Sequence, residues 1–216
     1  MATTVLGTPE AQDGLRHQDG TIGAGRGTAW LMVVTGALGL LASAVLTIEK
    51  IMVLQNPDYV PSCSFNPVLS CGSVMRTWQA STLGFPNMLM GLAGYAAVMA
   101  IGAGVLAGAR YRRWFWAGTQ IGVTFGVGFI HWLVYSSLYD IGALCPYCMV
   151  AWAATIPMFV YVTLHNLKSG VIPLPERGRR ALAGALEFHW VITVTWFLVI
   201  AILILTRFWA YWSTLI

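Results

Sequence analysis

Five long apolar stretches constrain this chain more than any other feature of its sequence. They lie near residues 30–52, 87–108, 115–138, 146–165 and 190–212. Each is long enough to cross the hydrocarbon core of a bilayer, which takes roughly 20 apolar residues in a helix. Only 9% of the residues are charged, whereas about a quarter are charged in an ordinary soluble domain. The sequence therefore predicts an all-α integral membrane protein with five transmembrane helices.

The segments between these stretches predict the organisation of the chain. They are a tail at 1–29, an exposed loop at 53–86, a basic turn at 109–114, a short turn at 139–145 and a polar linker at 166–189. The tail is rich in Gly, Thr and Asp and has no apolar periodicity, so we expect it to be disordered.

Lys and Arg residues predict the orientation, because cytoplasmic segments carry an excess of them. Nine of the twelve lie in the tail, the basic turn and the linker, and the other three are Lys50, Arg76 and Arg207. We therefore expect the amino terminus on the cytoplasmic side of the cytoplasmic (inner) membrane. The net charge of +4 is spread over short connecting segments, so we expect no nucleic-acid partner.

All four cysteines lie on the predicted extracytoplasmic side, where disulfides persist. Cys63 and Cys71 are in the 53–86 loop, and Cys145 and Cys148 form a CPYC box at the start of the fourth stretch. Zinc usually needs four ligands with closer spacing, and neither segment contains a His, so we expect no metal site. The four thiols are interpreted as two cooperating pairs.

The CPYC box has the chemistry of a reactive pair. Pro146 suits the first position of a helix, which places Cys145 at the cap and Cys148 in the first turn. Amide hydrogens and the helix dipole stabilise a thiolate there. The alternative is a structural disulfide or two inert thiols, but a bridge within one helical turn adds little stability. Exchange with the loop pair then supplies electrons, and the final acceptor in the bilayer is expected to be a quinone.

Four motifs occur together with this spacing and membrane placement. They are CSFNPVLSC (63–71), GSVM (72–75), GFPNMLMG (84–91) and CPYC (145–148). With these four motifs in this order, the chain resembles the bacterial form of the vitamin K epoxide reductase family over roughly residues 30–165. The resemblance implies a catalytic four-helix bundle around a quinone of the menaquinone or ubiquinone type. It also implies a thioredoxin-fold (DsbA-like) electron donor and the regeneration of protein disulfides outside the cytoplasm.

The same resemblance implies a role for individual residues. Cys148 is the thiolate beside the quinone, and Cys145 is its disulfide partner, which exchanges with Cys71. Cys63 completes the electron shuttle. Asn87 matches an asparagine that hydrogen-bonds a quinone carbonyl, and an Asn amide is a chemically reasonable donor there. The alternative for Asn87 is an ordinary residue at a helix start after Pro86.

Two departures from the family pattern affect these expectations. Trp152 stands where vertebrate members have a tyrosine, so one N–H donor replaces a hydroxyl at the expected quinone site. Many bacterial relatives carry a fused thioredoxin-like domain after the bundle. The segment at 190–216 is expected to contain the fifth transmembrane helix, and this chain ends soon after that apolar stretch, so we expect the partner to be a separate protein.

Other interpretations and residues stay open at this stage. One alternative is a quinone-linked disulfide generator of the DsbB type, which has its two cysteine motifs in the reverse order. Another is a membrane scaffold or transporter with structural cysteines, although the apolar stretches offer few polar residues for a pathway. His131 lies within the third stretch and is assigned no role. Glu49 and Lys50 are expected to pair with each other or with lipid headgroups.

Overall fold

The computed structural model describes residues 20–173, 175, 178, 184 and 186–214. Within these residues, five helices are long and apolar enough to cross a membrane. They are α2 (Arg26–Gln55), α4 (Asn87–Leu106), α5 (Arg113–Tyr135), α6 (Pro146–Lys168) and α8 (His189–Arg207). The predicted all-α membrane fold with five spanning helices is confirmed.

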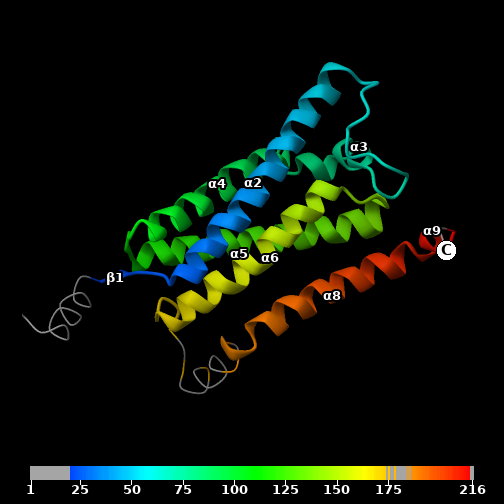
Figure 1. Cartoon of the computed structure of the whole chain (residues 1–216). Coiled ribbons are helices and arrows are strands. Elements are labelled where there is room, and N and C mark those ends of the chain that lie inside the picture. The colour runs from blue at the N-terminus through cyan, green and yellow to red at the C-terminus, as the bar shows by residue number, and fades with distance from the viewer. Residues whose placement is uncertain (1–19, 174, 176–177, 179–183, 185, 215–216) are drawn as a thin grey trace, which may run out of the picture.

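Four of these helices form a bundle, and the fifth lies outside it. Helix α2 packs along α4 and α6, and α5 packs along α6. Figure 1 shows α8 running beside α6, on the side of the molecule away from α4. Helices α2 and α4 approach closely because Gly36 and Gly39 face Met99 and Tyr95, where a Cβ atom would overlap the neighbouring side chain.

The helix ends differ from the predicted boundaries where the chain makes local turns. Helix α5 continues as the π-helical turn η2 (Ser136–Ile141), and Gly142 then turns the chain with a φ of 69°, a value that favours glycine. Helix α8 ends at Arg207, and the short helix α9 (Trp209–Trp212) follows it. The predicted fifth stretch therefore corresponds to two helices instead of one.

The end of the bundle opposite the cysteines is closed by a short strand pair. Strand β1 (Thr21–Ile22) pairs with β2 (Tyr111–Arg112) in antiparallel register. Buried Trp116 donates its Nε1–H to the carbonyl of Ile22 at 3.1 Å. The described part of the predicted disordered tail thus contains a strand and the first turn of α2, and residues 1–19 lie outside the described residues. Parts of the predicted linker, at 174, 176–177, 179–183 and 185, lie outside them as well.

Candidate redox site

The loop between α2 and α4 folds around a disulfide that joins Cys63 to Cys71. Asn66 turns the chain between them, because its side-chain oxygen accepts hydrogen bonds from the amides of Val68 and Leu69. Ser70 then caps the short helix α3 (Cys71–Met75), which is followed by the 3-10 helix η1 (Trp78–Ser81). The sequence predicts an exposed loop, but Cys63 and Cys71 are only 3% and 0% exposed. The disulfide is therefore covered by its own loop and the bundle.

Backbone pairing brings this loop to the CPYC box. Val68 accepts a hydrogen bond from the amide of Leu144 at 2.7 Å, and the amide of Ser70 donates to the carbonyl of Leu144 at 2.9 Å. Leu144 and Ser70 are each followed by a cysteine. As a result, the Sγ atom of Cys145 lies 3.2 Å from the Sγ atom of Cys71. This contact places a thiol against a disulfide sulfur, as thiol–disulfide exchange requires.

Two consecutive residues of α2 anchor the two arms of the loop. Glu49, which is 6% exposed, accepts hydrogen bonds from the amide and hydroxyl of Ser62. Lys50 donates from Nζ to the carbonyl of Met75 at 2.7 Å, at the end of α3. The expectation that Glu49 and Lys50 pair with each other or with lipid headgroups is wrong, because both side chains bind the loop.

The CPYC box begins α6 as the sequence predicts. Cys145 is the N-cap, Pro146 is the first helical residue, and the amide of Cys148 donates to the sulfur of Cys145 at 3.4 Å. Both Cys145 and Cys148 carry thiols that are outside any disulfide in the described chain. A hydrogen bond from the Cys148 thiol lowers the pKa of Cys145. Burial opposes this shift, and hydrogen bonds from the amides of Cys148 and Tyr147 add to it. A lower pKa favours the thiolate, which is the reactive form in disulfide exchange.

A cavity of about 620 Å³ adjoins the CPYC box. It extends between α4 and α5, which pack on other helices more than on each other. Its lining is mostly apolar and includes Met88 and Met90 from α4 together with Gly118, Gly122 and Gly126 from α5. Cys145 and Cys148 both contribute to its wall. The volume falls within the range of roughly 300 to 1,000 Å³ that is typical of small-molecule sites.

A few polar groups interrupt this apolar wall. Asn87 donates from Nδ2 to the carbonyl of Gln79 at 2.6 Å, and its Oδ1 accepts a hydrogen bond from the amide of Thr82. Since an amide nitrogen carries two hydrogens, one N–H of Asn87 remains for a ligand. Trp152 also lines the cavity and is 3% exposed, and its Nε1–H has no hydrogen-bond partner among the described residues. A buried donor of this kind is expected to find an acceptor, such as a carbonyl oxygen of a ligand.

The family model of the vitamin K epoxide reductase family matches residues 30–163. The chain belongs to this family. No curated protein matches the chain. The protein is therefore a multi-pass membrane protein of the vitamin K epoxide reductase family with two cysteine pairs, and its membership implies an oxidoreductase of this type.

The fold brings all six predicted site residues of this family member to one end of the bundle. Cys63 and Cys71 are bonded to each other, Cys145 touches Cys71, and Cys148 lines the cavity. Asn87 and Trp152 lie on the wall of the same cavity.

Sequence reasoning missed a further polar pair in the cavity wall. Tyr95 of α4 and Thr155 of α6 line the cavity, and their hydroxyl oxygens are 2.7 Å apart. The Tyr95 hydroxyl also lies 3.1 Å from the carbonyl of Ala151. The available signal was a tyrosine in the middle of an apolar stretch, since polar groups inside a membrane usually need a partner.

Proposed function

We propose that this protein oxidises a dithiol protein outside the cytoplasm and passes the two electrons to a quinone in the membrane. The observation that carries this proposal is the 3.2 Å contact between the sulfurs of Cys145 and Cys71. Cys148, on the other side of the CPYC box, lines the cavity. One cysteine of the box therefore faces the loop disulfide, and both are within reach of an apolar site suited to a quinone.

The electrons enter at the loop pair. A separate thioredoxin-fold (DsbA-like) protein reduces the Cys63–Cys71 disulfide and gains a disulfide of its own. Because both loop cysteines are buried, the loop must leave Leu144 before a partner reaches them. This exchange regenerates the disulfide of the partner, which then introduces disulfides into other proteins.

The second exchange moves the electrons to the CPYC box. The Cys71 thiolate attacks Cys145 in a Cys145–Cys148 disulfide and releases Cys148 as a thiolate. Cys63 then attacks Cys71, which forms the Cys63–Cys71 disulfide and releases Cys145. The arrangement of one loop disulfide and two thiols in the box corresponds to the product of this step. The lowered pKa of Cys145 makes it a good leaving group.

The final step reduces the quinone. Cys145 and Cys148 give up two electrons and two protons, the disulfide between them forms again, and the quinone becomes a quinol. The remaining N–H of Asn87 and the unpaired Nε1–H of Trp152 supply donors that polarise the quinone carbonyls. The cavity between α4 and α5 accommodates the apolar part of the quinone.

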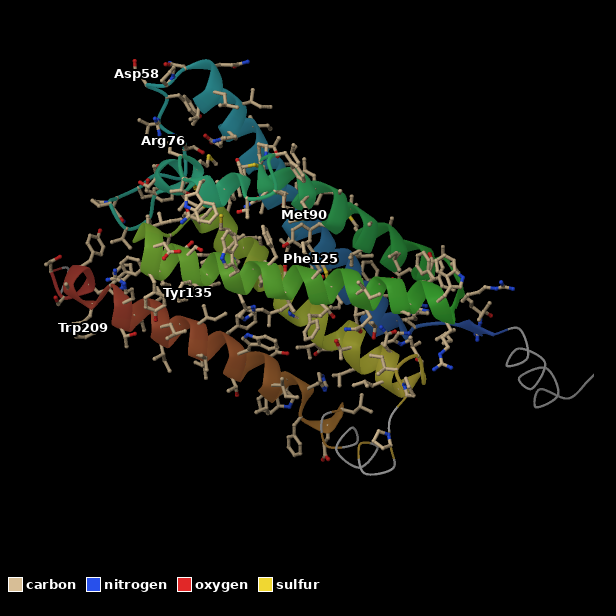
Figure 2. The ribbon with its side chains drawn as sticks, turned by 180° about the vertical axis from the view of Figure 1, so that it is seen from behind. Asp58, Arg76, Met90, Phe125, Tyr135 and Trp209 are labelled. Carbon is tan, nitrogen blue, oxygen red and sulfur yellow. A yellow bond between two sulfur atoms is a disulfide. The ribbon has the colours of Figure 1, made fainter. Side chains whose placement is uncertain are left out.

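The proposed topology follows from the charge distribution. Residues 30–165 form the catalytic bundle, the amino terminus is cytoplasmic, and the cysteines are extracytoplasmic. Five crossings then place the end of α8 on the same side as the cysteines, in accord with Figure 2. There Arg76 of the loop, Tyr135 of α5 and Trp209 of α9 lie toward one end of the molecule.

Quinone reduction by the purified protein tests the proposal directly. With dithiothreitol as electron donor, the wild type is expected to reduce a soluble quinone analogue, and the Cys148→Ser variant is expected to lose this activity. A Cys63→Ser/Cys71→Ser variant serves as the matched control, because dithiothreitol reduces the CPYC box without the shuttle pair and no loop thiol remains to bond with Cys145. Wild-type turnover in Cys148→Ser would contradict the proposed mechanism.

A further inference from the structure

The fifth helix, α8, is attached to the bundle by a partly buried polar contact as well as by apolar packing. Trp196 of α8 donates its Nε1–H to Nε2 of His131 in α5 at 2.8 Å. The other ring nitrogen of His131, Nδ1, lies 2.6 Å from the carbonyl of Val127. Since an indole N–H only donates, Nε2 of His131 is the acceptor and the proton is on Nδ1. His131 thus links two helices within the membrane.

A second polar contact joins α8 to the segment before the CPYC box. Arg207, the last residue of α8, donates from Nε to the carbonyl of Leu138 at 2.8 Å. Leu138 lies in η2, the π-helical turn that ends α5. The last carbonyls of a helix lack partners within the helix, and a cation near them also complements the helix dipole. Arg207 therefore stabilises the turn that leads into the chain reversal at Gly142.

Apolar packing extends this attachment to the reactive cysteines. Ile200 and Phe208, at the outer half of α8 and just beyond it, share one buried cluster with Leu138, Leu144 and Trp152. Cys148 packs against the same cluster. Leu144 immediately precedes Cys145 and makes the two backbone hydrogen bonds to the loop. Residues of α8 and the position after it thus share one apolar cluster with residues on both sides of Cys145.

We propose that α8 positions Cys145 against Cys71, with Arg207 and Trp196 as positioning residues. Both residues act through α5 and η2, and neither lines the cavity. The inference rests on the proposed function, because the positioning by α8 assists disulfide exchange between Cys71 and Cys145. It assigns a role to the helix that lies outside the four-helix bundle.

The test measures how strongly the fold favours a bond between these two sulfurs. In a Cys63→Ser/Cys148→Ser protein, Cys71 and Cys145 are the two remaining cysteines. Its equilibrium with reduced and oxidised glutathione gives the effective concentration of one thiol at the other. Adding Arg207→Gln or Trp196→Phe is expected to lower this effective concentration roughly fivefold, the effect of losing one hydrogen bond that orients the segment. Mass spectrometry of the peptides measures the fraction that is bonded.

Two further variants separate positioning from a general effect of substitution. Arg207→Lys keeps a cation and a donor, and we expect it to restore most of the lost effective concentration. Thr206→Ala is the matched control, because the Thr206 hydroxyl is exposed and bonds to the carbonyls of Ile202 and Leu203 in its own helix. We expect Thr206→Ala to behave as the parent protein does.

An unchanged effective concentration in folded Arg207→Gln would overturn the positioning role of α8. If that variant does not yield folded protein, Trp196→Phe, which keeps an aromatic ring at the position, decides by the same criterion. The measurement uses neither quinone nor a protein partner. A wild-type protein that failed to reduce quinone would therefore overturn the proposed function alone. Quinone reduction by the wild type, together with an unchanged effective concentration in Arg207→Gln, would overturn the positioning role of α8 alone.

Discussion

The carboxylate of Glu49 accepts hydrogen bonds from the backbone amide and the hydroxyl of Ser62, the residue before Cys63. The next residue of α2, Lys50, binds the carbonyl of Met75 at the far end of the same loop. One turn of a membrane helix therefore secures both arms of the shuttle loop. In the proposed cycle, this attachment keeps the loop closed over the bundle until a partner binds.

Loss of the Glu49 charge is expected to loosen the loop. In a Glu49→Gln variant, a neutral amide replaces a carboxylate that accepts hydrogen bonds from Ser62, and hydrogen bonds to charged groups contribute about 1.5–3 kcal/mol. We expect the Cys63–Cys71 disulfide to be reduced by a water-soluble phosphine roughly tenfold faster than in the wild type. Asp58→Asn, which neutralises an exposed carboxylate of the same loop, is the matched control. Equal rates in the two variants would rule out the anchoring role.

Removal of Cys63 is expected to trap the intermediate of the exchange. Without Cys63, the exchange cannot go forward from the bond between Cys71 and Cys145, whose sulfurs are 3.2 Å apart in the wild type. Cys148 can only reverse the exchange, by attacking Cys145 and releasing Cys71. Peptide mapping after alkylation should find a Cys71–Cys145 disulfide in the Cys63→Ser protein. The reciprocal Cys71→Ser variant should accumulate no comparable bond between Cys63 and Cys145. A bond of Cys63 to Cys145 in that variant would reverse the roles of the loop cysteines.

The thiolate of Cys145 is expected to persist at lower pH than an ordinary thiolate. Its pKa is lowered, first of all by the hydrogen bond from Cys148, so the reactive form declines only when the pH falls through this lowered value. The ultraviolet absorbance of the thiolate, taken as the difference between wild type and Cys145→Ser, measures the titration. Cys148→Ala should move the midpoint back toward that of a free thiol. A wild-type midpoint at or above the free-thiol value would contradict the prediction.

The cavity between α4 and α5 is expected to set the affinity for quinone. Gly122 lines it, and a Cβ at this position meets no atom within 4 Å, so Gly122→Leu projects a side chain into the space without a clash. We expect the KM for quinone to rise at least about tenfold, because the bulky side chain competes with the ligand. Gly128→Leu lies on the same helix outside the cavity lining and also has open space. A KM that rises equally in both variants would place the quinone elsewhere.

Several parts of the site were predictable because they depend on residues close together in the chain. The start of α6 follows from Pro146 at the first helical position, which puts Cys145 at the cap, and this prediction is confirmed. The spanning helices follow from the length of each apolar stretch. His131 had no such local signal, because its partner Trp196 is 65 residues away in the chain.

Length and composition by themselves determined that this chain is a helical membrane protein, and the order of its motifs indicated the family. They did so because each spanning helix satisfies its own backbone hydrogen bonds in lipid and needs no distant partner. The family resemblance implied that Cys145 exchanges with Cys71, but only the tertiary structure placed their sulfurs 3.2 Å apart across 74 positions of sequence. Only the structure joined Arg207 of α8 to the carbonyl of Leu138. Such contacts depend on backbone pairing and side-chain packing between segments that are distant in the sequence.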